Sequence, residues 1–511
     1  MAIGRRGFLR AGTVAAAASA VSAAVPSPMS AGRPAGGVAP RHWDSLRRGV
    51  QGDVVLPGDP GYTGAIQLQV AEYDKVRPAA VLYCESERDV STGLLFAQDH
   101  DLPLVPRSGG HNNAGYSTCE GLVLDVSRMN GVSVGGAATR VGAGLQAVDA
   151  LPALAPYGVA LPNGTCPTVS VAGFVTGGGT GPFSRRCGVA PDNLRAARVV
   201  LADGSVVTCD DDRHPDLFWA IRGGGGGNFG IITEYTLEHV PVSRMSRFRL
   251  VWPWDSAVEV ALGFQEWLPD LSRDIAADLL AVLPDAAPGS PPLLQLVGTS
   301  LGESRALEAS LDRLVALTGT EPSERTAADL PYQEAMMAVW GCADKTVQQC
   351  HRVGADPAGQ LPRDAFSLVR GRLVDEPVGE SGVTGLLEAF EADRLPGQTR
   401  VMSWRAMGGR TNEIDPAATA FQHRTAAFNV SFVFGLTRTN REQEEKDAVL
   451  SSLHNAFDTL DPHSNGHTLQ NFTDPYLPGW RHAYYGRNSA RLVRTRRAYD
   501  RHRFFRLGQA I

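Results

Sequence analysis

The sequence lacks the short motifs that bind nucleotides or metal ions in several common enzyme classes. No glycine-rich stretch leads into the Gly-Lys-Ser/Thr of a P-loop, and no G-x-G-x-x-G opens a helix with an acidic residue about 20 positions later. Neither a Cys-x-x-Cys pair nor the His/Cys spacing of a zinc site occurs. These absences argue against a P-loop nucleotidase or a nicotinamide-dependent Rossmann enzyme, and we expect no metal.

Long hydrophobic runs are also missing. The Ala-rich stretch 11–24 falls short of the roughly 20 apolar residues that a spanning helix needs, and no later segment qualifies. It follows Arg5-Arg6-Gly7-Phe8-Leu9-Arg10 and includes Val21-Ser22-Ala23, a small-residue cleavage site. Residues 1–38 therefore resemble a twin-arginine signal followed by a disordered leader. We expect an extracytoplasmic protein with no membrane span, exported folded by the twin-arginine machinery after cofactor loading.

The chain has little excess charge of either sign. Its 48 Lys and Arg residues against 54 Asp and Glu give a net charge of −6, so no nucleic-acid partner is indicated. A basic cluster near the end of the chain is interpreted as a solvated helix face or a cover for phosphate groups. The members of that cluster are Arg491, Arg494, Arg496, Arg497, Arg501 and Arg503.

Cysteine is scarce, and the seven residues of this type cannot all pair with one another because their number is odd. In an extracytoplasmic protein some of them could form disulfides, but spacing does not reveal the connectivity. They are Cys84, Cys119, Cys166, Cys187, Cys209, Cys342 and Cys350.

Glycine, in contrast, is concentrated in two segments. Arg107-Ser108-Gly109-Gly110 follows the apolar run Leu102–Val105, and Gly164-Thr165-Cys166-Pro167-Thr168-Val169 precedes Gly177-Gly178-Gly179-Thr180-Gly181. Successive glycine amides can form an anion-binding nest, which would suit a pyrophosphate with Arg107 as its counter-charge. The alternative for the first segment is a tight turn after a strand.

The ordered set of motifs resembles the berberine-bridge-enzyme-like flavoproteins, within the vanillyl-alcohol-oxidase (PCMH-type) FAD fold. Arg-Ser-Gly-Gly-His-Asn, Gly-x-Cys-Pro-Thr-Val, the Gly177–Gly181 run and the segment Trp219–Gly230 occur in the family's order. The resemblance extends from Val76 to Val242 and returns in the tail, at Tyr484–Leu492 and from Tyr499 to Ile511.

The resemblance implies an FAD bonded to His111 through an 8α-histidyl link and to Cys166 through a 6-S-cysteinyl link. The alternatives are a hydrogen-bonded loop histidine and a buried structural thiol. Val169 matches the position that gates oxygen access in this family, where valine is typical of oxidases. The expected further cofactor contacts are Arg107, Ser108, Gly109, Gly110, Asn112, Gly115, Thr168, Val169, Gly177, Gly178, Gly179, Asn228 and Asn488.

The expected fold class is α+β. A two-part PCMH-type FAD-binding domain covers 39–242, a substrate domain with an antiparallel sheet covered by helices covers 243–464, and 465–511 rejoins the first domain. Hydrophobic patterns predict strands at 80–83, 102–105, 122–126, 199–201 and 205–207 and a helix at 87–100. In the second domain they predict helices at 257–268 and 304–317 and strands at 293–297, 399–407 and 427–436.

Alternation along the two late strands predicts their faces. Asn429 and Ser431 share one face of 427–434 and are opposite the apolar residues, while Ser403 and Arg405 lie opposite Met402 and Trp404. The polar face lines the flavin cavity or meets solvent, and the sequence leaves both readings open.

The proton acceptors that are usual in the family are missing. Leu469-Gln470-Asn471-Phe472-Thr473-Asp474 matches its Tyr-x-Asn-Tyr-x-Asp motif with Leu469 in place of the tyrosine, and Phe174 replaces a frequent histidine. The carboxylate of alkaloid-oxidising relatives falls near Asn429 or Ser431. Tyr485 is therefore the candidate for the catalytic base, and the weaker candidates are Tyr484, Asp474, Arg405 and His423.

These features predict an FAD-dependent oxidase. A carbohydrate-like or secondary-metabolite alcohol would give hydride to the covalently bound flavin, and molecular oxygen would then be reduced to hydrogen peroxide. The alternatives are a flavin dehydrogenase with a different electron acceptor and a flavin-binding protein without efficient turnover.

Overall fold

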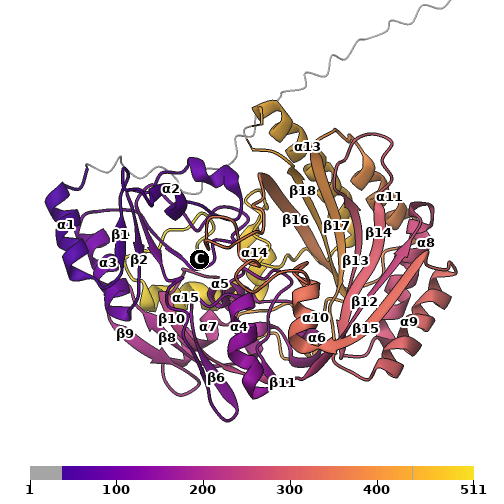
Figure 1. The fold of residues 1–511 in the computed structure, drawn as a ribbon, viewed down its shortest axis with the longest axis horizontal. Helices are drawn as coiled ribbons and strands as arrows, with labels where there is room; N and C mark the ends of the chain where they lie inside the picture. The colour runs from indigo at the N-terminus through magenta and orange to yellow at the C-terminus, as the bar shows by residue number, and fades with distance from the viewer. Residues whose placement is uncertain (1–36, 440) are drawn as a thin grey trace, which may run out of the picture.

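The computed structural model describes residues 37–439 and 441–511 and shows two halves side by side (Figure 1). The predicted twin-arginine signal, with the leader up to residue 36, lies outside the described residues. Within the described residues, no helix is both long enough and apolar enough to cross a membrane.

The first half begins with a four-stranded sheet in the order β1-β2-β4-β3. Strands β2 and β3 run parallel to β4, and β1 pairs antiparallel with β2. The runs in β2 and β4 are almost entirely buried, as parallel strands require. The strands are β1 (Asp53–Val55), β2 (Ala80–Tyr83), β3 (Leu104–Arg107) and β4 (Leu122–Asp125), and the helices packed on them are α1 (Pro40–Gly49) and α3 (Glu87–Asp99).

A five-stranded antiparallel sheet in the order β5-β6-β10-β8-β9 forms the second part of this half. The hairpin between β8 and β9 turns at Gly204, whose φ of 81° suits glycine. The two-part FAD-domain architecture that we expected is therefore present. The strands are β5 (Val132–Val134), β6 (Ala138–Gly142), β8 (Leu194–Val200), β9 (Val206–Cys209) and β10 (Ile231–Glu238), and the helices α4 (Ala147–Leu154), α5 (Val171–Gly177), α6 (Ser184–Cys187) and α7 (Pro215–Ile221) join them.

The other half is built on a seven-stranded antiparallel sheet in the order β15-β12-β14-β13-β17-β18-β16, with helices on its outer face (Figure 1). The strands are β12 (Arg244–Trp252), β13 (Ile275–Leu283), β14 (Leu293–Ser300), β15 (Glu324–Pro331), β16 (Phe366–Val374), β17 (Gln398–Ala406) and β18 (Phe428–Leu436). The covering helices are α8 (Ala257–Trp267), α9 (Ser304–Thr318), α11 (Glu380–Glu391) and α13 (Gln443–Leu460), and α10 (Tyr332–Val339) lies beside β12 and β15.

The predicted faces of β17 and β18 are confirmed on the apolar side. Trp404 and Phe428 stack within the core shared with the helices. On the polar side Asn429 and Ser431 are buried. Leu373 of β16, which is paired with Asn429, packs in an apolar cluster with Met407 and Phe421. For β18 the solvent reading is therefore wrong, although neither of these two side chains reaches the cavity described below.

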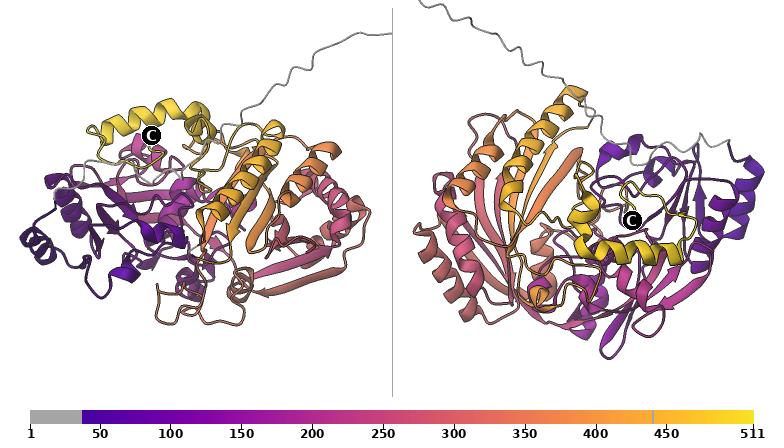
Figure 2. Two further views of the ribbon diagram at one scale, coloured as in Figure 1. Left: turned by 90° about the horizontal axis from the view of Figure 1, so that it is seen from above. Right: turned by 180° about the vertical axis from the view of Figure 1, so that it is seen from behind.

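The tail returns to the first half. Helices α14 (Trp480–Tyr485) and α15 (Ser489–Tyr499) lie across it, as Figure 2 shows from behind. The guanidinium of Arg491 lies 4.0 Å over the ring of Trp219 on α7. Arg496 is buried and donates to the backbone carbonyls of Phe505 and Ile511. For Arg496 the predicted roles, a solvated face or a phosphate cover, are wrong because its N–H groups hold the chain end.

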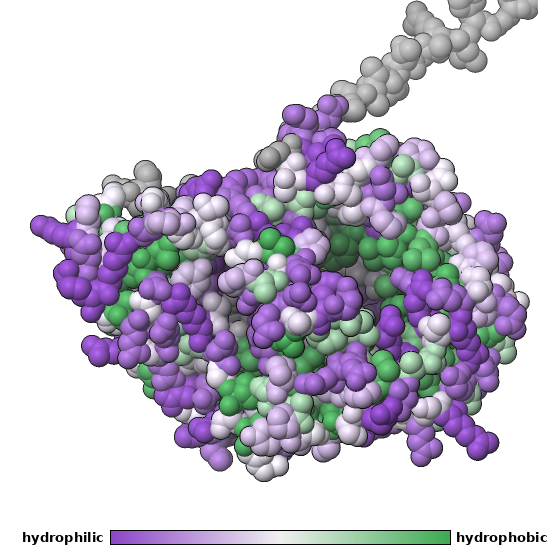
Figure 3. Space-filling view, in the orientation of Figure 1, coloured by the Kyte–Doolittle hydropathy of each residue, from purple (hydrophilic) through white to green (hydrophobic). Residues whose placement is uncertain are grey.

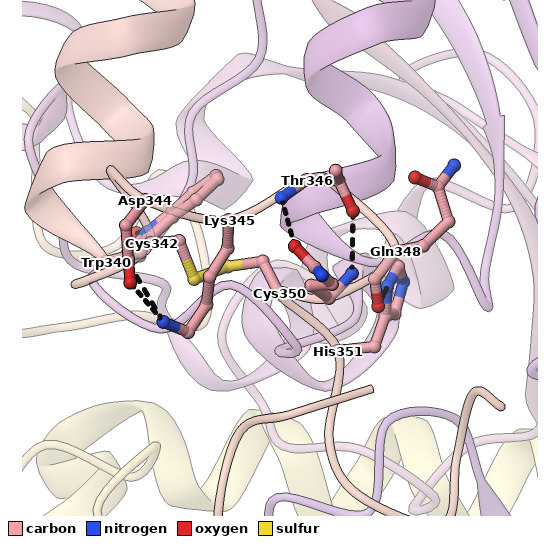
Figure 4. The surroundings of a disulfide bond; sticks show 10 residues. Trp340, Cys342, Asp344, Lys345, Thr346, Gln348, Cys350 and His351 are labelled. Atoms are coloured by element: carbon pink, nitrogen blue, oxygen red, sulfur yellow. Dashed lines mark hydrogen bonds and ion pairs between the residues drawn. A yellow bond between two sulfur atoms is a disulfide. The ribbon is translucent and has the colours of Figure 1, made fainter. Parts of the chain in front are cut away.

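A disulfide joins Cys342 to Cys350, with their Cα atoms 5.8 Å apart (Figure 4). The residues flanking it are bonded to the first half: Trp340 Nε1 donates to Gly164 O over 3.2 Å, and His351 Nε2 contacts Asp149 of α4 at 3.1 Å. The closed loop therefore supports the segment that carries Cys166. The other five cysteines of the described chain are free thiols.

Candidate functional site

A cavity of about 320 Å³ is lined by residues from both halves, a size typical of small-ligand sites. Figure 3 shows the surface hollowed between the halves in this orientation. Four segments form most of its wall: 106–117, 164–180, 226–235 and 470–473. The predicted cofactor residues that line it are Arg107, Ser108, Gly109, Gly110, His111, Asn112, Cys166, Val169 and Asn228.

His111 presents a neutral imidazole to this cavity. Burial, helped by the nearby Arg352 guanidinium, lowers the pKa of His111 to about 4. Its Nε2 lies 2.7 Å from Thr168 Oγ1. When Nε2 carries the proton and donates it to Thr168, the free lone pair lies on Nδ1. An imidazole in this state can act as a nucleophile.

The sulfur of Cys166 faces the same cavity, so it is accessible although protein surrounds it. Burial raises the pKa of the Cys166 thiol, while the Arg405 guanidinium lowers it and Asp364 raises it. The shift of this pKa is upward overall, so the electrostatics of the site favour the protonated thiol. It is the place of the sulfur at the cavity wall that lets Cys166 meet a bound molecule.

The first glycine segment fits a close approach by an anionic ligand. Gly110 has a φ of 68°, and both Gly109 and Gly110 line the cavity without side chains. Arg107 is less free than we expected, because its Nε bonds Asp125 at 2.5 Å and its Nη2 donates to Ala65 O at 2.7 Å. Its Nη1 is buried and has no hydrogen-bond partner among the described residues. That unsatisfied donor suits a phosphate oxygen.

Several predicted cofactor residues pack against other parts of the protein. A Cβ at Gly115 would come within 2.5 Å of the Tyr73 ring, and one at Gly178 within 2.7 Å of Phe421. Gly177 and Gly179 are likewise closed off by neighbouring atoms, and none of these glycines lines the cavity. The absent side chains at these positions make room for protein, and the contact of these glycines with the cofactor stays a prediction.

Two predicted polar cofactor residues have protein partners in this structure, and their contact with the cofactor stays a prediction. Thr168 does not line the cavity and contacts His111 instead. Asn488 Nδ2 donates to the carbonyls of Pro416, Thr419 and Ala420, at 2.8 to 3.3 Å. Asn488 therefore fastens the tail to a loop of the other half.

The proposed base is also misplaced. Tyr485 is buried in the core of the first half, and burial raises the pKa of its hydroxyl. It does not line the cavity, whereas its neighbour Tyr484 does. The Tyr484 hydroxyl accepts a bond from Asp474 N at 2.9 Å.

The remaining base candidates divide between the cavity and the core. Asp474 forms a buried pair with Arg370 at 2.8 Å, and His423 is buried away from the cavity. Arg405 lines the cavity. Leu469 belongs to an apolar cluster with Phe421 and Met407. The tyrosines that line the cavity are Tyr116, Tyr235 and Tyr484.

The tail supplies part of the cavity wall that was not predicted from the sequence. Gln470, Asn471, Phe472 and Thr473 line the cavity, as do Leu507 and Gln509. Asn112 Nδ2 donates to Thr473 Oγ1 over 3.2 Å and joins the two walls. For Gln470–Thr473 the signal was available, because these four residues directly follow Leu469 in the matched motif.

The buried His423 makes stability depend on pH. Burial, reinforced by the adjacent His467, lowers the pKa of His423 to about 3, against about 6.5 in an unfolded chain. Between these values only the unfolded state binds the proton, so the free energy of unfolding rises with pH. His423→Gln should reduce that slope by about 1.4 kcal/mol per pH unit, as urea unfolding between about pH 4.5 and pH 6 would show.

The control for this experiment is His463→Gln, which removes an exposed imidazole and should leave the slope as in the wild type. Equal slopes for His423→Gln and the wild type would contradict a neutral buried imidazole.

Comparison with known families agrees with this geometry. The family model described as "FAD binding domain" matches residues 78–210, and the one described as "Berberine and berberine like" matches residues 470–511. The two matched regions contain most of the cavity wall, including His111 and Cys166 in the first and Gln470–Thr473 in the second.

Individual relatives match along part or most of the chain. The FAD-linked oxidoreductase YvdP of Bacillus subtilis is 30% identical over 471 residues, covering 90% of this chain and 98% of the relative. The (R)-6-hydroxynicotine oxidase of Paenarthrobacter nicotinovorans is 34% identical over 240 residues, 46% of this chain and 48% of the relative. The structure of Physcomitrella patens BBE-like 1 shares the fold, with a TM-score of 0.81 at 24% identity over 92% of this chain and 98% of that one. The chain therefore belongs to the berberine-bridge-enzyme-like family of FAD-linked oxidoreductases.

Proposed function

We propose that this oxidoreductase holds its FAD by two covalent bonds, an 8α-histidyl link to His111 and a 6-S-cysteinyl link to Cys166. It oxidises the CH–OH group of a carbohydrate-like or secondary-metabolite alcohol with oxygen as acceptor, giving hydrogen peroxide. It acts outside the cytoplasm after twin-arginine export. The observation that carries the proposal is that His111 and Cys166, on different loops, line one cavity.

The side chains around these two residues support the assignment. Thr168 holds the imidazole of His111 through Nε2, which leaves Nδ1 for a bond, and the Cys166 thiol lines the same cavity. Phe174 and Phe472 line the cavity and limit the water that reaches the reacting atoms. When bound there, FAD supplies a hydride acceptor and, once reduced, a reductant for oxygen.

Val169 supports oxygen as the acceptor. It lines the cavity three residues after Cys166, at the position whose side chain is typical of the oxygen-reactive members of this family. A flavin dehydrogenase is the alternative for this step. Mixing the substrate-reduced enzyme with air-saturated buffer in a stopped-flow instrument separates the two, because an oxidase is reoxidised rapidly by oxygen.

The experiment that tests the proposal has two parts. Acid-precipitated wild-type protein should stay yellow, because both links survive denaturation, and colour in the supernatant would refute covalent attachment. The enzyme should then be screened for peroxide release with sugars, alcohols, amines and phenols. Release with an alcohol supports the oxidase, and a coloured protein that no alcohol reduces would refute alcohol oxidation.

One observation favours a second candidate, a flavin-binding protein without efficient turnover. In the described chain no aspartate or glutamate lines the cavity, and the position of the usual tyrosine is taken by the buried Leu469. Such a protein would be reduced slowly by light but by none of the substrates in the screen.

A further inference from the structure

We propose that Arg405 binds an anionic oxygen of the substrate, so that the substrate is an acidic molecule with an apolar body, such as a phenol, an enol or a carboxylic acid. The inference rests on the proposed function and narrows its substrate class. It points to an acidic secondary metabolite and away from a neutral sugar.

Arg405 is held rigidly at the cavity wall. It lies on β17 directly opposite Asp278 of the neighbouring strand β13. Its Nε and Nη2 donate to the two carboxylate oxygens of Asp278 at 2.9 and 3.0 Å, and Nη1 donates to Thr180 Oγ1 at 3.3 Å. This bidentate pairing fixes the plane of the guanidinium before any ligand arrives.

The pairing leaves donors for a ligand. A guanidinium carries five N–H groups, and the three bonds to Asp278 and Thr180 leave two of them, on Nη1 and Nη2, without a partner among the described residues. Arg405 lines the cavity and Asp278 does not. The guanidinium of Arg405 therefore faces the cavity, whereas the carboxylate of Asp278 does not.

The charges of the wall favour an anion at this place. Arg107 and Arg405 are the lysine or arginine residues that line the cavity, and within the described residues no carboxylate side chain does so. Arg107 forms an ion pair with Asp125. It belongs to the first glycine segment, where the anionic part of the cofactor fits. Arg405 is the cation left for the substrate.

The sheet beyond Arg405 offers an apolar surface. Leu280 and Val282 of β13, Val401 of β17 and Val433 of β18 lie on the same sheet face as Arg405 and are half-buried. In Figure 3 apolar residues gather in the hollow on this side of the molecule. A ligand with its acidic oxygen on Arg405 could rest an apolar body on these side chains.

This arrangement bears on the missing base where the anionic oxygen is conjugated with the carbon that loses hydride, as it can be in a phenol or an enol. Such an oxygen has already given its proton to solvent, and its electron pair forms the new double bond as hydride leaves. A carboxylate has no such effect, because the O–H of the reacting alcohol must still give up its proton. For a phenol or an enol, Leu469 in the position of the family's tyrosine is therefore compatible with turnover.

The test uses the holoenzyme and two probes of similar shape, benzoate and the neutral benzamide, with binding followed through the change in flavin absorbance. Wild-type protein should bind benzoate at least about 10-fold more tightly than benzamide. Arg405→Met should weaken benzoate binding by about 10- to 100-fold and leave benzamide binding unchanged. Equal affinity for both probes in the wild type would overturn the proposal.

Removing one partner of the Arg405–Asp278 pair could unfold the domain. The double variant Arg405→Met/Asp278→Asn removes both charges and should show the same selective loss of benzoate binding. The matched control is Arg249→Met, which breaks a pair with Glu324 on the same sheet, 2.7 Å apart, and should keep both affinities. If both Arg405 variants still bind benzoate as the wild type does, the proposal is overturned. This conclusion holds even if the flavin of these variants is no longer bonded to Cys166.

The proposed function fails separately from this inference. Failure of the proposed function appears in the wild type as a colourless protein pellet after acid precipitation. Benzoate binding can still be measured in that case by calorimetric titration, which needs no flavin signal. A wild-type protein with covalent flavin but no preference for benzoate would refute only the role of Arg405.

Discussion

Replacing both His111 and Cys166 by alanine should release all of the flavin into the supernatant when the protein is precipitated with acid. The two side chains are the imidazole and the free thiol that line the cavity, so the double variant keeps the binding site but has no atom to bond the ring. Peroxide release should fall by at least about 100-fold, because loss of correct positioning alone has effects of this size. The measurements are flavin absorbance in pellet and supernatant, and initial rates.

The single variants separate the two links. Each should keep a yellow pellet through the remaining bond, and Cys166→Ala should also shift the absorbance spectrum because the ring loses its sulfur substituent. The matched control is Cys187→Ala, which removes a free thiol outside the cavity and should change neither spectrum nor colour. A yellow pellet from the double variant would mean that other residues hold the flavin.

Arg424→Met should destabilise the protein by about 3–5 kcal/mol, the usual cost of removing one partner of a buried ion pair. Arg424 contacts both carboxylate oxygens of Asp192 at 2.7 and 2.8 Å, and the exposed fractions of the two side chains are 1% and 3%. Methionine fills much of the space but leaves Asp192 charged and unpaired away from water. Urea unfolding at neutral pH gives the free energy.

The control for this prediction is Arg313→Met, which breaks a pair with Asp270 whose side chains are 53% and 55% exposed. Exposed pairs contribute about 0–1 kcal/mol, so this variant should unfold almost as the wild type does. A similar small effect of Arg424→Met would mean that water reaches Asp192.

The sequence predicted the cavity residues best where a residue lies inside a specific motif. His111 and Cys166 could be predicted because each lies in such a motif and the motifs occur in the family's order. Gly109 and Gly178 gave the same compositional signal, and a side chain at either would meet protein atoms, yet only Gly109 lines the cavity. Composition does not separate these uses, because both require only the absence of a side chain.

The base candidate shows a second limit. Tyr484 and Tyr485 are consecutive on α14, so their side chains point in directions about 100° apart, and only Tyr484 lines the cavity. Which of the two does so depends on the rotation of the helix about its axis. That rotation is set by packing against other segments, which no local pattern encodes.

The large sheet shows the same limit at the level of topology. The strands 293–297, 399–407 and 427–436 were predicted nearly in place, whereas β12, β13, β15 and β16 were not. Strand β16 pairs with β18 and not with a neighbour in sequence. Pairings of this kind are decided by which faces must be buried together.

The wall of the cavity has a consequence for how the protein is assembled. Asn112 and Thr473, which bond each other beside the cavity, are 361 positions apart, and Leu507 and Gln509 complete the same wall. Contacts so distant along the chain form late, because closing long loops costs entropy before it is repaid. A nascent chain cannot enclose a dinucleotide here until nearly all of it has left the ribosome. The amount of flavin that stays bound to the purified protein therefore measures the fraction of molecules that are natively folded.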